Sequence, residues 1–211
     1  MEKYSLSLAL FDFLPTIAFL VGAFFLVRTA LICRGIRCGR MLMAGSLLVF
    51  LGGFLKATWK LLYAADIADI RWMSEAQFIM LGIGFLAICV SIILMARQPR
   101  ADEKLVALAA MAPWKIPFLF LMTITSLGAE GILAYIAFRR NLRPAAVGFV
   151  IGVMGILAMG ALASAEQTIA MQWIEESVNT VGQTGFMVGS ILLHRDFKTR
   201  GCSLSTDKEC A

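Results

Sequence analysis

The chain is built from apolar blocks that are separated by short polar or charged connectors. A helix needs about 20 residues to cross the roughly 30 Å hydrocarbon core of a bilayer, and each block is close to that length. We therefore predict an all-α membrane protein, a bundle of six transmembrane helices. The predicted spans are residues 13–32, 41–63, 73–96, 116–138, 144–163 and 174–193.

Composition supports this prediction. Hydrophobic residues make up 60% of the chain and charged residues only 16%, whereas soluble domains average about 45–50% and 25%. The net charge of +5 comes from basic residues between the blocks, where they anchor helix ends to anionic head groups. We expect the lipid bilayer, and no nucleic acid, as partner. The first block is interpreted as a retained span rather than a cleaved signal peptide, which predicts a multi-pass protein of a plasma (inner) membrane.

The two halves of the chain share short matches at nearly constant spacing. We expect a first three-helix half over residues 1–104, a second over 105–194, and a polar tail over 195–211. Because an odd number of spans per half reverses the second copy, the matches predict a 3+3 inverted repeat, a plan common in transporters. Chance similarity is the alternative, since the matches are few. They are Trp72 and Glu75 with Trp173 and Glu176, Gly84-Phe85 with Gly185-Phe186, and Pro15 with Pro117.

Basic residues are nearly balanced between the two faces of this six-span topology, with ten on the N-terminal face and eight on the other. The positive-inside rule therefore gives little bias, and the density of basic residues in the 139–143 turn and the tail favours cytoplasmic termini only slightly. An error of one in the span count, weakly biased insertion and a dual-topology dimer are the alternatives. The apolar stretch Leu105–Ala112 is too short to cross and is predicted to be interfacial.

Two ionisable residues fall inside predicted spans, where each costs about 2.5–3.5 kcal/mol on insertion scales. Glu130 lies fourteen residues after Ile116, roughly 21 Å along a helix, and Arg28 is its predicted partner across the repeat. Lys56 shares one helix face with Gly45 and Gly52, so its ammonium either points inward or snorkels. Structural ion pairing is the alternative role for these residues. Lys60 is expected to snorkel to the interface beside Trp59 and Tyr63.

The last predicted span carries a polar stripe at helical spacing, and the third span carries a fainter one. Such a stripe is unlikely to face lipid throughout, so we expect it to line a polar cavity. Interface-level carboxylates and interhelical amide hydrogen bonds are the alternative. The stripe residues are Glu175, Glu176, Asn179 and Gln183, with Glu75 and Gln77 in the third span. Gly148, Gly152 and Gly155 are interpreted as a helix-packing face.

No motif for a metal, a cofactor or catalysis is recognisable, so none of these is predicted. His194 is the single histidine, which excludes zinc motifs that need two within the chain. Cys33 and Cys38 could form a disulfide or half of a metal site, but unpaired thiols are the favoured interpretation. Asp12 is interpreted as a helix cap or an interface group.

These features predict a small transporter or channel for a polar or ionic solute, with a charged cavity between two three-helix halves. The alternative is a non-catalytic membrane subunit or lipid-binding scaffold that mates with another membrane protein. A third possibility is an intramembrane enzyme acting on a lipid or quinone, disfavoured because no catalytic constellation is visible. The glycine-rich helix faces also allow a homodimer.

Overall fold

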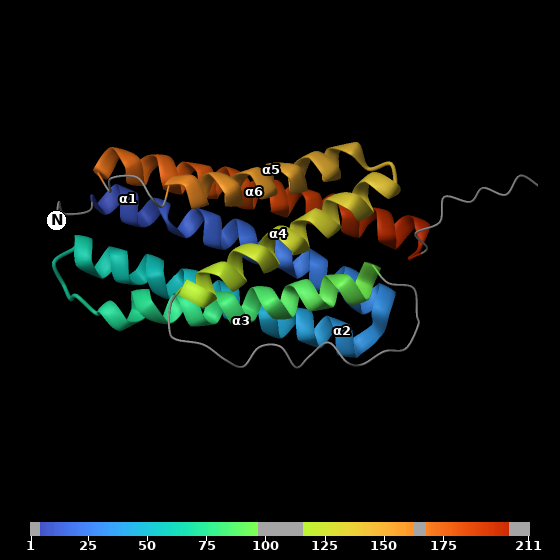
Figure 1. The fold of residues 1–211 in the computed structure, drawn as a ribbon, viewed down its shortest axis with the longest axis horizontal. Coiled ribbons are helices and arrows are strands. Elements are labelled where there is room, and N and C mark those ends of the chain that lie inside the picture. Colours follow the sequence, from blue (N-terminus) through green and yellow to red (C-terminus); the bar gives the residue numbers. More distant parts are fainter. Residues whose placement is uncertain (1–4, 97–115, 163–167, 203–211) are drawn as a thin grey trace, which may run out of the picture.

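The structure, a computed structural model, describes residues 5–96, 116–162 and 168–202, and every regular element within these ranges is an α-helix. The helices lie alongside one another and run roughly along the long axis of the molecule (Figure 1). This confirms the predicted all-α class. The elements are α1 (Leu6–Phe11), α2 (Phe13–Ala64), α3 (Arg71–Ala96), α4 (Ile116–Arg139), α5 (Arg143–Leu162) and α6 (Ile169–Arg200).

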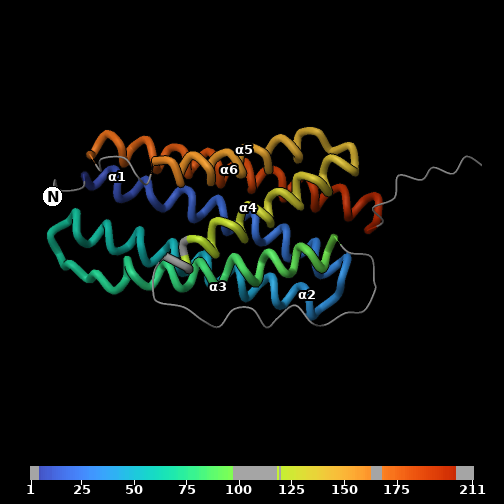
Figure 2. Tube along the Cα trace, viewed as in Figure 1, coloured from blue at the N-terminus to red at the C-terminus, as the bar shows by residue number. Residues whose placement is uncertain are grey.

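Helix α2 reverses direction at Gly35. Its φ of 78° and ψ of −171° are non-helical, and glycine adopts a positive φ at little cost. The two arms of α2, residues 13–34 and 36–64, fold back on each other, so that the rings of Phe13 and Phe54 lie 5.6 Å apart. The reversal is visible where the blue tube turns back (Figure 2). The two arms contain the predicted spans 13–32 and 41–63.

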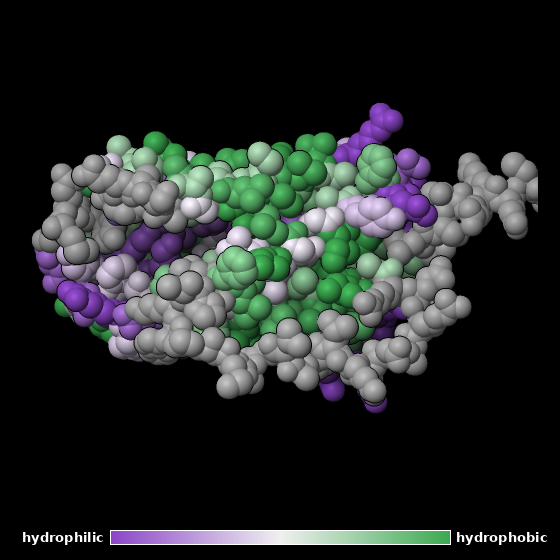
Figure 3. All heavy atoms as spheres, viewed as in Figure 1, coloured by the Kyte–Doolittle hydropathy of each residue, from purple (hydrophilic) through white to green (hydrophobic). Residues whose placement is uncertain are grey.

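Four helical stretches are long and apolar enough to cross a membrane by length and composition, which suggests a membrane protein. The first of them, Leu6–Ala64, contains both arms of α2. Large apolar side chains such as Phe120 and Phe138 are more than 60% exposed, and apolar surface dominates the middle of the molecule between polar ends (Figure 3). Helix α6 is not among the four because polar residues recur along it. The stretches are Leu6–Ala64, Arg71–Ala96, Phe120–Arg139 and Arg143–Leu162.

Helices α3 and α4 pack in parallel, which contradicts the predicted inversion of the second half. A Cβ built on Gly82 would lie 2.8 Å from Phe118, and one built on Gly128 would lie 3.5 Å from Cys89. Residue numbers therefore rise together along the contact, and Figure 1 shows both helices ending on the same side. An inverted repeat requires α4 to begin where α3 ends and to run the opposite way. The two halves instead point in the same direction.

Glycine pairs bring the helices of each half into close contact. In the first half, a Cβ on Gly45 would lie 2.7 Å from the carbonyl oxygen of Gly84. In the second half, a Cβ on Gly148 would lie 2.6 Å from the carbonyl oxygen of Gly185. Such contacts are typical of small residues in membrane helix interfaces, and they agree with the packing role predicted for Gly148.

Two predictions concern the ends of elements. The stretch Leu105–Ala112 lies outside the described residues. The polar tail does not begin at residue 195, because α6 continues to Arg200. Asp196 and Phe197 are buried there, and these tertiary contacts extend the helix beyond its apolar block.

Candidate functional site

A partly open cavity of about 530 Å³ lies between the helices and is lined by residues from both arms of α2 and from α3, α4, α5 and α6. Its wall is mixed, because phenylalanine and methionine side chains alternate with polar groups. Six of the nine residues predicted as a solute or ion site line it. They are Lys56, Gln77, Glu130, Glu175, Asn179 and Gln183.

Glu130 is the most deeply buried acid of the cavity wall, with 6% of its surface exposed. Its Oε2 atom has no hydrogen-bond partner. Gly152 on α5 provides the space for this group, because a Cβ at that position would overlap the Glu130 carboxylate. The hydroxyl of Ser126, one turn earlier on α4, donates to the carbonyl of Thr123 at 3.1 Å. The helices thus place the Glu130 carboxylate at the cavity wall, where one of its two oxygen atoms has no hydrogen-bond donor.

A buried ion cluster lies beside the cavity at the end opposite Gly35. The Lys60 ammonium is 2.5 Å from Glu176 Oε1 and 3.0 Å from Asp12 Oδ2, and Lys56 Nζ is 3.8 Å from the same Glu176 oxygen. Asp12, Lys60 and Glu176 are each at most 6% exposed. The cluster joins the start of α2, its second arm and α6. Glu176 therefore belongs to this cluster, which Lys56 connects to the cavity.

The cluster corrects two predictions. Lys60 does not snorkel to the interface, because its ammonium is enclosed by two carboxylates. Asp12 makes no side-chain capping bond to the α2 backbone and pairs with Lys60 instead. One feature of the sequence did indicate that Lys60 faces the interior of the bundle. Lys60 shares a helix face with Gly45 and Gly52, which pack against α3. Nothing in the sequence indicated Asp12 as its partner.

Two of the predicted site residues lie away from the cavity. Arg28 is exposed on the first arm of α2, with its guanidinium 5.7 Å from the ring of Phe24. The predicted ion pair between Arg28 and Glu130 is therefore not formed. Glu75 is exposed, whereas Gln77 on the same helix is buried and lines the cavity. The two differ because side chains two residues apart on a helix point in different directions.

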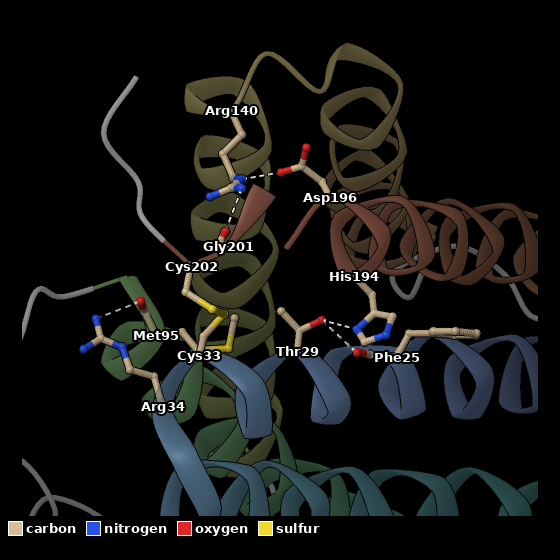
Figure 4. The surroundings of a disulfide bond; sticks show 10 residues. All are labelled: Phe25, Thr29, Cys33, Arg34, Met95, Arg140, His194, Asp196, Gly201 and Cys202. Atoms are coloured by element: carbon tan, nitrogen blue, oxygen red, sulfur yellow. Dashed lines mark hydrogen bonds and ion pairs between the residues drawn. A yellow bond between two sulfur atoms is a disulfide. The ribbon is translucent and has the colours of Figure 1, made fainter. Parts of the chain in front are cut away.

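The opposite end of the bundle is tied together by a disulfide between Cys33 and Cys202, whose Cα atoms are 5.3 Å apart (Figure 4). The prediction of unpaired thiols is wrong for Cys33, whose partner lies 169 residues away. Cys38 is free, and its thiol donates to the carbonyl of Ser91 at 3.4 Å. Arg140 reinforces the same end of the bundle by binding Asp196.

His194 also belongs to this end, where its Nδ1 atom lies 3.0 Å from Thr29 Oγ1 (Figure 4). Within the described ranges, no three His, Cys, Asp or Glu residues are placed to hold a metal ion. The cavity is thus the feature on which a functional hypothesis can be built. Comparison with family models, with curated proteins and with solved structures found no match for the chain.

Proposed function

We propose that the chain is a small membrane transporter or channel that passes a polar or ionic solute through the cavity between its two three-helix halves. In this proposal six described helical segments cross the bilayer, because α2 crosses once with each arm and α6 forms the last of these crossings. The halves follow each other in the same direction, a plan that also occurs among membrane transporters.

The observation that carries the proposal is the buried, incompletely partnered carboxylate of Glu130 in a cavity to which all six segments contribute. An ionisable group at this depth is costly and typically marks an ion or substrate pathway in membrane proteins. A purely structural role would require a compensating partner for the Glu130 Oε2 atom, and the described residues provide none. The amides of Gln77, Asn179 and Gln183 add groups that can replace the hydration of a solute.

Solute uptake into liposomes that contain the purified protein tests the proposal. We expect uptake or ion flux from a panel of labelled solutes, and a loss of at least tenfold in rate for Glu130→Gln, which keeps the side-chain size but removes the charge. Glu75→Gln is the matched control, because this carboxylate is exposed and away from the cavity. The proposal fails if no solute or ion moves under any gradient, or if both variants behave like the unmodified protein.

A further inference from the structure

Two acceptor atoms in the cavity wall have no hydrogen-bond partner. Glu130 Oε2 and Gln183 Oε1 are both buried without a partner, and both residues line the cavity. A carboxylate oxygen only accepts hydrogen bonds, and a buried acceptor without a donor is costly. A ligand that carries N–H groups would supply the missing donors.

Among the described residues, no lysine or arginine forms an ion pair with Glu130 in the cavity wall. The adjoining cluster uses its own cations, since Lys60 lies between Asp12 and Glu176, and Lys56 Nζ is 3.8 Å from the same Glu176 oxygen. Because Lys60 is enclosed by Asp12 and Glu176, it does not compensate Glu130. An anionic ligand would therefore be disfavoured, and a cation would restore neutrality.

Much of the remaining wall is apolar and aromatic. Phe19, Phe50, Phe78 and Phe85 line the cavity, and aromatic faces attract cations as well as apolar groups. The volume of about 530 Å³ is in the range of sites for small organic molecules, roughly 300–1,000 Å³. A bare Ca²⁺ or Mg²⁺ ion would instead require about six converging oxygen ligands, and among the described residues no three acidic side chains are placed to hold a metal ion.

From these observations we infer that the cavity binds a small organic ammonium ion, with its N–H groups on Glu130 and its apolar body against the phenylalanines. This inference narrows the proposed transport function to one substrate class. Gly152 is part of the site, because it leaves the space that the Glu130 carboxylate occupies.

Calorimetric binding to the purified protein in lipid nanodiscs tests the inference without any transport assay. The probe is phenethylammonium, compared with phenethyl alcohol, with phenylacetate and with trimethylphenethylammonium, which keeps the charge but has no N–H. We expect phenethylammonium to bind most tightly. The neutral and trimethyl compounds should bind about ten- to hundredfold more weakly, because they lose a charge-assisted hydrogen bond.

Variants locate the site. Glu130→Gln should weaken phenethylammonium binding by at least tenfold, and Gly152→Ala should weaken it by displacing the carboxylate, whereas Glu75→Gln should leave it unchanged. Preferred binding of phenylacetate, equal binding of all four compounds, or unchanged binding by Glu130→Gln would each overturn the inference. The ligand series on the unmodified protein remains decisive even if a variant does not fold. Amine binding without uptake would contradict transport alone, and uptake of another solute without amine binding would contradict only the substrate class.

Discussion

Lys60 illustrates how a single charged residue is accommodated inside this bundle. The residue is only 6% exposed, and its ammonium group lies between the carboxylates of Asp12 and Glu176. Removal of one member of a buried ion network leaves the others as uncompensated charges, which typically costs about 3–5 kcal/mol. The cluster is therefore sensitive to the loss of any one member.

We expect Lys60→Met to lower the free energy of unfolding by about 3–5 kcal/mol, because Asp12 and Glu176 lose their shared partner. Arg71→Met is the matched control. Its ion pair with Asp69 also spans 3.0 Å, but the Arg71 side chain is 82% exposed, so its loss should leave the free energy of unfolding nearly unchanged. Denaturant titration of both purified variants measures the difference, and equal effects would contradict a buried cluster.

At the scale of elements, the glycine contacts should determine how firmly α5 and α6 associate. A Cβ on Gly185 would lie 2.6 Å from the carbonyl oxygen of Gly148, so Gly185→Ala should force the helices apart and cost about 1–3 kcal/mol, as overpacking usually does. Gly131→Ala is the control, because nothing lies within 4 Å of its added methyl group. That change should be neutral or stabilise by up to about 1 kcal/mol through helix propensity. Thermal unfolding of the two variants in one detergent tests this contrast, and similar melting temperatures would refute it.

The helices were predictable from the sequence because each apolar block has the length that a membrane-crossing helix requires. The predicted span 73–96 differs from α3 by two residues at its start, and 116–138 differs from α4 by one at its end. The direction of α4 relative to α3 was not predictable. Nothing in the sequence of α4 indicates that Phe118 packs at Gly82, and this tertiary contact makes α4 parallel to α3.

The cavity was partly predictable, since Glu130 and the α6 stripe are polar groups at positions where lipid would penalise them. The buried cluster was not, because Lys60 and Glu176 are 116 residues apart and either could have reached a head group alone. The type of a residue and its position along a span indicate which polar groups must be buried away from lipid. Which residue becomes the partner depends on packing between helices that are distant in the sequence.

At the scale of the whole molecule, the parallel arrangement changes the distribution of charge. The Gly35 reversal, the α4–α5 turn and the end of α6 lie at one end of the molecule (Figure 1), where the disulfide joins Cys33 to Cys202. Among the described residues, this basic end holds ten lysines and arginines, and the opposite end holds three. The sequence predicted nearly equal numbers of basic residues on the two faces. That prediction assumed an inverted second half, which placed the 139–143 turn on the face opposite the Gly35 reversal. The ten are Arg28, Arg34, Arg37, Arg40, Arg139, Arg140, Arg143, Arg195, Lys198 and Arg200, and the three are Lys56, Lys60 and Arg71.

An excess of Lys and Arg marks the cytoplasmic side of a membrane protein, so we expect the basic end to be cytoplasmic. Two reporter cysteines in a background without native cysteines test this orientation. Ile67→Cys lies in the exposed α2–α3 turn and Thr199→Cys on the exposed last turn of α6. A membrane-impermeant maleimide should label the first in intact cells and the second only after permeabilisation. The reverse pattern would contradict the charge argument, and labelling of both would indicate dual topology.

The same orientation bears on the disulfide. Cytoplasmic thiols are normally kept reduced, so in the predicted orientation Cys33 and Cys202 should be thiols in growing cells and should pair only on oxidation. An alkylation-shift assay on the chain with its native cysteines, performed on rapidly acidified cells, reads out this state. A bond that persists in unstressed cells would favour the opposite orientation, because the linked end would then face an oxidising compartment. Cysteine labelling and the alkylation shift therefore test the same orientation independently. If the basic residues determine the orientation, both experiments must place the end with Cys33 and Cys202 in the cytoplasm.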